Sequence, residues 1–171
     1  TQLSNVPNGI GEFKLSPDEK SLMYISYVKS DVKTAKDSDP KLDKADAYVA
    51  EDLMYRHWDH WVTELPHTFV AKLGSEITPD NSIDILANEE KLYELPTEPH
   101  GGLEQLDWTP DGKYIAYSCK KKTGKEYAFS TNTEIYIYNV ADGTCTVIPM
   151  GGGYDTNPVW SPDGKKIVWL S

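Results

Sequence analysis

The stretch Trp108-Thr109-Pro110-Asp111-Gly112-Lys113 decides the fold, because it recurs as Trp160-Ser161-Pro162-Asp163-Gly164-Lys165. A third copy, Ser16-Pro17-Asp18-Glu19-Lys20, begins the chain's first apolar run. Proline at the second turn position fixes φ at about −65°, Asp and Ser bond back to the backbone, and Gly supplies a positive φ. Each copy therefore predicts a β-hairpin. Glu19 replaces the glycine in the first copy, so we expect that turn to be slightly strained.

The spacing of the hairpins predicts the blades of a β-propeller. Pro110 and Pro162 are separated by close to the roughly 40–50 residues of one four-stranded blade. The distance from Pro17 to Pro110 is nearly twice as long, and we interpret it as one blade that carries an insertion at residues 30–65. We therefore predict an all-β fold. It is a partial β-propeller of about two four-stranded blades plus the first strands of a third, in one domain over residues 1–171.

Runs of apolar and aromatic residues place the strands of these blades. The first blade spans residues 11–99, and its strands are expected at 11–16, 21–28, 67–73 and 82–86. The second blade spans residues 103–150, and its strands are expected at 105–108, 113–119, 133–140 and 144–148. The third blade begins within residues 155–171 and has only its first two strands there.

The insertion in the first blade is predicted to have two parts. Its charged, proline-containing start, residues 30–44, is expected to be a surface excursion. Residues 45–65 are expected to be helical, because apolar side chains recur along one stripe at helical spacing. The stripe consists of Ala47, Ala50, Met54, Trp58, Trp61 and Leu65.

Charge and hydropathy exclude several classes of function. The formal net charge of −10 produces a field that repels nucleic-acid backbones and anionic membrane surfaces, so we expect no nucleic-acid partner. No apolar run approaches the roughly 18 residues of a membrane span, and none is predicted. Cys119 and Cys145 fall on strands separated by a third strand, beyond the roughly 7 Å reach of a disulfide. They are expected to be free thiols.

The sequence carries no catalytic or cofactor-binding motif of its own. Gly-x-Ser-x-Gly is absent, and the glycines at 151–153 lack the Lys-Ser/Thr of a phosphate loop, so we interpret them as an interblade linker. His57 and His60 have a spacing found in metal sites but no third ligand, so neither a metal nor a cofactor is predicted. Glu51 and Asp52 are either solvated helix acids or a pair that binds a substrate's free amino terminus through charge-assisted hydrogen bonds.

Four segments carry a resemblance to a known family. They are the hairpins at 108–113 and 160–165, the inserted Glu51-Asp52-Leu53-Met54-Tyr55-Arg56-His57-Trp58 that leads to Leu65-Pro66-His67-Thr68-Phe69-Val70, and Thr123-Gly124-Lys125-Glu126-Tyr127. Together they resemble the propeller domain of the prolyl oligopeptidase family of serine peptidases, particularly its dipeptidyl and acylaminoacyl peptidase branches. The resemblance implies that the catalytic Ser, Asp and His belong to a C-terminal α/β-hydrolase domain, so no catalytic residue is expected in this chain.

The same resemblance implies a function and a set of partners. We expect an N-terminal propeller fragment of a serine exopeptidase that gates the access of peptide substrates to the hydrolase domain of a longer parent. The family's paired glutamates for amine binding are matched only in part, by Glu51 and Asp52. A periplasmic or secreted parent is implied, with a cytoplasmic one as the alternative. The alternative function is a TolB-like propeller that binds proteins. Open blade edges are expected to promote self-association in either case.

Overall fold

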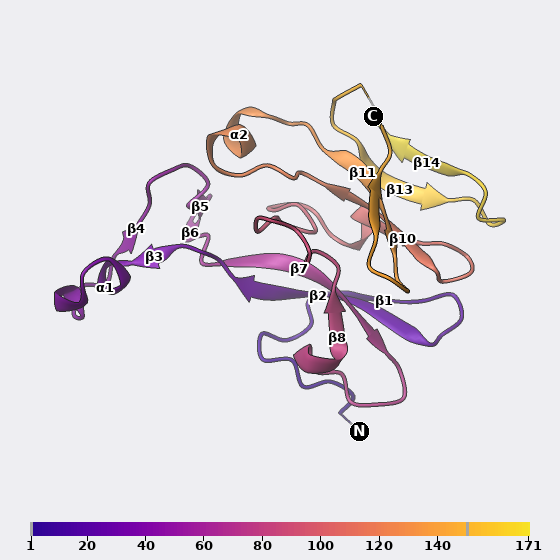
Figure 1. Ribbon diagram of the computed structural model, residues 1–171, viewed down its shortest axis with the longest axis horizontal. Helices are drawn as coiled ribbons and strands as arrows, with labels where there is room; N and C mark the ends of the chain where they lie inside the picture. Colours follow the sequence, from indigo (N-terminus) through magenta and orange to yellow (C-terminus); the bar gives the residue numbers. More distant parts are fainter. Residues whose placement is uncertain (1, 150) are drawn as a thin grey trace.

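The structure is a computed structural model that describes residues 2–149 and 151–171. Residue 1, the first of the predicted domain, and residue 150, the last of the predicted second blade, lie outside the described residues. In the described part, two four-stranded antiparallel sheets and a further hairpin lie side by side, and two small hairpins lie in the insertion (Figure 1). The predicted all-β fold is confirmed.

The first blade is a four-stranded antiparallel sheet with the strand order β1-β2-β7-β8. Its strands are β1 (Phe13–Leu15), β2 (Ser21–Lys29), β7 (Glu64–Lys72) and β8 (Ser82–Asp84). The two central strands pair along their whole length, from Ser21 opposite Lys72 to Lys29 opposite Glu64. A 3₁₀ turn, η2 (Pro79–Asn81), leads into β8. The strands predicted from the apolar runs therefore form.

The second blade is a sheet with the order β12-β11-β10-β9. Its strands are β9 (Leu106–Trp108), β10 (Tyr114–Cys119), β11 (Glu134–Asn139) and β12 (Cys145–Val147). The 3₁₀ turn η3 (Leu103–Gln105) precedes β9, and the short helix α2 (Gly124–Phe129) lies between β10 and β11. Because β11 separates β10 from β12, Cys119 and Cys145 are free thiols, as predicted.

The third hairpin consists of β13 (Thr156–Trp160) and β14 (Ile167–Leu170). It packs beside the second blade, where the carboxylate of Asp107 accepts a hydrogen bond from the Trp160 backbone N–H at 2.9 Å. The other oxygen of Asp107 binds Lys14 Nζ of the first blade at 2.6 Å. One side chain on β9 thus contacts all three units.

The main core lies between the first and second blades. It brings residues of β2 and β7, such as Met23 and Val70, against residues of β10 and β11, such as Ile115, Tyr117 and Tyr136. Burying these large apolar and aromatic side chains is the main favourable term that holds the blades face to face. A smaller cluster covers the other face of the first blade. Two blades and part of a third, packed in this way, form a partial β-propeller, as predicted.

The three repeated turns have the same geometry. In the second hairpin, Thr109 Oγ1 accepts from the Tyr114 N–H at 3.0 Å and donates to Asp111 Oδ1 at 2.8 Å, and the same carboxylate oxygen accepts from the Lys113 N–H. Equivalent bonds occur in the first and third hairpins. They hold the pKa of Asp111 below its ordinary value, with the Thr109 hydroxyl as the largest cause. The side chains in the repeat therefore close the turn.

The fourth position of each turn has a left-handed backbone. Gly112 and Gly164 have φ of 69° and 67°, and Glu19 has φ of 56° at the same place. A side chain at such a φ costs about 1–2 kcal/mol because Cβ approaches the carbonyl oxygen. The strain expected at Glu19 is therefore present, and the first turn keeps the shape of the others.

The insertion forms an arm, residues 30–63, that projects away from the sheets (Figure 1). Its elements are β3 (Lys33–Thr34), α1 (Ala35–Ser38), η1 (Pro40–Leu42), β4 (Tyr48–Val49), β5 (Arg56–His57) and β6 (His60–Trp61). The helix predicted over 45–65 is wrong, because this stretch holds three short strands and the start of β7. Its aromatic and β-branched residues favour strands, and Met54 and Trp58, at φ of 63° and 44°, interrupt any helix.

Candidate functional site

A cavity of about 680 Å³ lies where the arm meets the body of the chain. Its lining comes from the arm, from residues 90–94 of the connection between β8 and β9, from residues 122–124 and 127 at the start of α2, and from Leu65 of β7. Both acids of the predicted amine-binding pair, Glu51 and Asp52, belong to its lining. The structure therefore places the predicted acidic pair at a cavity, although on an irregular segment between β4 and β5 and not on a helix.

Asp52 lies directly against the first residue of α2. Its Oδ1 accepts from the Leu53 N–H at 2.7 Å. Gly124 has φ of 58°, and a Cβ at that position would clash with the Asp52 carboxylate. Glycine therefore suits this position, because a side chain would be strained at this φ and would displace the Asp52 carboxylate. Glu51 and Asp52 are both exposed, so their carboxylates are accessible from solvent.

A buried acid lies deeper in the same cavity. Glu94 is 6% exposed, and both of its carboxylate oxygens have partners. Oε1 is 2.6 Å from Nε2 of His57, and Oε2 accepts from the Tyr127 hydroxyl at 2.5 Å and from the Glu98 N–H at 3.2 Å. Buried carboxylates need such partners, because desolvation of an unpaired charge is costly. The cluster joins β5, the connection after β8, and α2.

Protonation in this cluster follows from its geometry. The hydrogen bond to Glu94 raises the pKa of His57 above its ordinary value and outweighs the opposing effect of burial. Burial raises the pKa of Tyr127, and the Glu94 carboxylate adds to that shift, so the phenol is a neutral donor. Lys120 Nζ lies 3.9 Å from the centre of the Tyr127 ring, and burial lowers its pKa. The cavity therefore combines a buried ion pair with exposed acids at its mouth.

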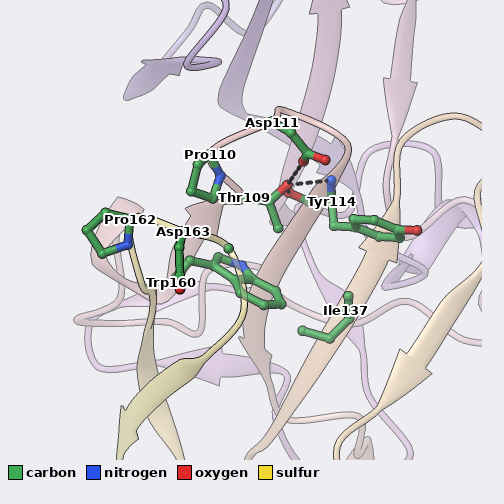
Figure 2. A pocket seen from close by; sticks show the side chains of 9 residues that line it. Thr109, Pro110, Asp111, Tyr114, Ile137, Trp160, Pro162 and Asp163 are labelled. Carbon is green, nitrogen blue, oxygen red and sulfur yellow. Dashed lines mark hydrogen bonds between the residues drawn. The ribbon is translucent and has the colours of Figure 1, made fainter.

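Figure 2 shows a smaller cavity, of about 360 Å³, between the turns of the second and third hairpins. Trp160, Tyr114 and Ile137 give it an apolar lining. The carboxylates of Asp111 and Asp163, which also line it, accept hydrogen bonds within their own turns. A Cβ at Gly164 would lie 3.5 Å from Cδ of Pro110, so the turns of neighbouring blades are stacked in contact. This cavity is a packing feature of the blade interface.

The two histidines of the arm do not form a metal site. His57 and His60 are cross-strand partners of the β5–β6 hairpin, with ring centroids 6.1 Å apart. Nε2 of His57 is paired with the Glu94 carboxylate, and His60 is exposed beside Asp59. Within residues 2–149 and 151–171, no three His, Cys, Asp or Glu side chains gather as metal ligands would. In the same residues no helix is long and apolar enough to cross a membrane.

Sequence reasoning found the acids at the mouth of the cavity but missed the buried cluster. Glu94 lies in the run Leu92-Tyr93-Glu94-Leu95-Pro96, where a single acid stands among apolar residues. Such an acid is a candidate for a paired, buried carboxylate, since unpaired ones are avoided in cores. Its partners His57 and Tyr127 could not be identified without the fold, because they are 37 and 33 residues away.

Several curated relatives of this chain are named dipeptidyl-peptidase 5. The dipeptidyl-peptidase 5 of Porphyromonas endodontalis is 46% identical over 171 residues, which is 99% of this chain and 24% of the relative. That of Porphyromonas gingivalis is 46% identical over 164 residues, 95% of this chain and 23% of the relative. The probable dipeptidyl-peptidase 5 of Aspergillus niger is 31% identical over 145 residues, 72% of this chain and 20% of the relative. The chain thus spans about a quarter of the length of the curated relatives it matches.

No family model matches the chain. Among solved structures, TolB from Acinetobacter baumannii aligns with 94% of this chain and 26% of its own, with a TM-score of 0.49 and 16% identity. The resemblance to dipeptidyl peptidases, inferred from the hairpins and the arm, is therefore confirmed by the sequence relatives.

Proposed function

We propose that this chain, a homologue of a quarter-length segment of the dipeptidyl-peptidase 5 proteins, is a non-catalytic propeller wall that gates peptide access to a serine-type α/β-hydrolase domain of a longer parent. The parent's substrates are then peptides, and its reaction is hydrolysis of a peptide bond. The position of the cavity beside a projecting arm supports a role in admitting short, unfolded chains. We treat residues 1–171 as one domain, with blades at 11–99, 103–150 and 155–171.

The cavity supplies the single observation that carries this proposal. An enzyme that releases dipeptides must measure two residues from a free amino end, and a carboxylate is the natural partner of that ammonium group. Glu51 and Asp52 are exposed at the mouth of the cavity, where a peptide end can reach them. We assign them the binding of the substrate's amino terminus, on an arm that lies over the cavity.

The open third hairpin also supports self-association of the isolated chain through unpaired blade edges. Val159, Val168 and Leu170 are exposed on β13 and β14, with 51%, 65% and 62% of their surface accessible. Exposed apolar strands of this kind are templates for pairing with another copy. We therefore propose contacts between copies through this face.

The amine-binding role is tested by neutralising the acids in the full-length protein. Glu51→Gln combined with Asp52→Asn should raise KM for a dipeptide ester or amide about 10-fold or more, as expected when a charge-assisted bond worth about 1.5–3 kcal/mol is lost. The rate constant kcat should fall less, since the reacting bond is not touched. Asp59→Asn, on an exposed acid of the same arm, is the matched control.

Three outcomes separate the alternatives. With an N-acetylated substrate, wild type and the double variant should have the same KM, because this substrate has no ammonium group to bind. An unchanged KM in the double variant would refute the assignment of these two acids. If a fluorophosphonate labels no serine of the full-length protein, the peptidase proposal itself fails, and a propeller that binds proteins becomes the better description.

A further inference from the structure

The cavity is bordered by a carboxylate that the proposed amine-binding role does not use. Glu94 is buried, and its two oxygens face different parts of the chain. One oxygen meets His57 at 2.6 Å, and the other accepts from the Tyr127 hydroxyl at 2.5 Å. The Glu98 N–H also donates to it, at 3.2 Å. The group is therefore saturated with partners and is not itself an open binding site.

These partners come from elements that share no sheet. His57 belongs to β5 of the arm, Glu94 to the connection between β8 and β9, and Tyr127 to α2 of the second blade. The arm hairpin pairs only with itself, since β5 and β6 form a two-stranded sheet of their own. The short link to β7 fixes one end of this hairpin, through the Ser30 N–H that donates to the Thr63 carbonyl, and side chains set how the hairpin meets α2. Glu94 forms hydrogen bonds to both elements, and the rings of His57 and Tyr127 lie 6.3 Å apart beside it.

The two residues that Glu94 contacts lie at or beside the lining of the cavity, because Tyr127 lines it and His57 follows the lining stretch that ends at Tyr55. Asp52 reaches the start of α2 at Gly124, five residues before His57 on the arm and three residues before Tyr127 on α2. A shift of either element changes the distance between the exposed acids and the opposite wall. Small displacements of a binding group have large effects on how a ligand is held.

We propose that Glu94 is a positioning residue whose single carboxylate holds the arm hairpin and α2 together, and so sets the shape of the cavity that the acids face. The predicted effect of Glu94 on substrate binding rests on the proposed function. The structural role, in which one acid orders two elements distant in sequence, rests on the hydrogen bonds alone.

Charged and titratable groups around the pair determine how the anchor depends on pH. Glu94 and Glu98 favour protonated His57, Lys120 opposes it, and the rings of His60 and Tyr127 lie 6.1 and 6.3 Å from that of His57. Because the pKa of His57 is raised on folding, its contribution is fully present below the unfolded value of about 6.5. It is lost as the pH rises through the folded pKa. The arm should therefore be held less firmly in alkaline solution.

The experiment is hydrogen exchange of the full chain, followed in peptides that cover residues 54–62 and 123–129. Glu94→Gln should speed exchange in both segments by about tenfold or more. His57→Gln should speed it in the first segment and Tyr127→Phe in the second. Glu126→Gln, the same change on an exposed acid of α2, is the control and should alter neither. The wild-type protection of 54–62 should fall with rising pH after correction for intrinsic rates, and that slope should vanish in Glu94→Gln.

The outcomes are distinct from those of the peptidase test. Unchanged protection of both segments in Glu94→Gln, or equal loss in both segments for all three variants, would overturn the shared-anchor role. Should Glu94→Gln fail to fold, the separate effects of His57→Gln and Tyr127→Phe still decide the matter. In the full-length enzyme, Glu94→Gln should raise KM with little change in kcat. A protein without peptidase activity would remove that readout but leave the exchange result standing.

Discussion

The repeated hairpin turns and the arm acquire their shapes in opposite ways. Each turn is closed by side chains of its own five residues, as when Thr109 and Asp111 bind the backbone N–H groups of the strand that follows. The arm has almost no such local closure near the cavity, and its position depends on His57, which meets an acid 37 residues later. Local hydrogen bonds can be recognised in a sequence, whereas a pair this distant can be recognised only once the fold is known.

The largest effect should come from breaking the arm's anchor. His57→Ala leaves Glu94 buried with fewer partners and should lower the free energy of unfolding by about 3 kcal/mol, the lower end of the range for one-sided loss of a buried ion pair. Urea denaturation at pH 6, where the pair is fully formed, measures it. His60→Ala, at the exposed end of the same hairpin, should have almost no effect. Equal effects from both would show that the hairpin and not the ion pair matters.

A smaller effect should come from opening one turn. Thr109→Val keeps the shape of the side chain but removes the hydroxyl that accepts from the Tyr114 N–H, and should cost about 1–2 kcal/mol. Thr109 is buried, whereas its counterpart Ser161 in the third hairpin is partly exposed. Ser161→Ala should therefore cost less, because water can replace the lost partner. Thermal unfolding monitored by tryptophan fluorescence compares the two, and the reverse order would contradict the role of burial.

The smallest effect should be a gain. Glu19→Gly removes a side chain from a left-handed backbone and should stabilise the protein by about 0.5–1 kcal/mol, after the greater flexibility of glycine in the unfolded chain is subtracted. Gly112→Ala should do the opposite at the equivalent position, where the added Cβ meets only ordinary contacts and backbone strain is the main cost. Differential scanning calorimetry resolves both. A destabilised Glu19→Gly variant would show that the Glu19 side chain has a contact more valuable than the strain.

The blades could be predicted from the sequence because their signals are local. Strand residues such as those of Tyr114–Cys119 stand beside turn residues with a fixed chemistry, so each hairpin identified its own strands. Residues 45–65 are predicted as a helix because Met54, Trp58 and Trp61 fit a helical stripe, whereas in the structure these residues lie in or just before the β5–β6 hairpin. Bulky aromatic side chains, which favour strands, and the left-handed backbone of Met54 and Trp58 favour the hairpin over the helix.

The candidate site divides in the same way. Glu51 and Asp52 were selected as two adjacent acids in an insertion, which is a property of the sequence alone, and the structure places them at a cavity. Glu94 was not selected, because its role depends on which residues surround it. A single acid in an apolar run indicates burial, but only the packing of α2 against the arm shows what that acid holds.

The close approach of Asp52 to Gly124 has a use beyond this molecule. A side chain at position 124 would be strained at φ of 58° and would displace the Asp52 carboxylate, so glycine there is a marker of this close approach. Among related sequences, a glycine at this point and a short acid at position 52 should occur together, and they should change together. A relative with a bulky residue at 124 is expected to hold the acid at position 52 elsewhere. A sequence comparison can therefore sort relatives by the shape of their cavity before any of their structures is known.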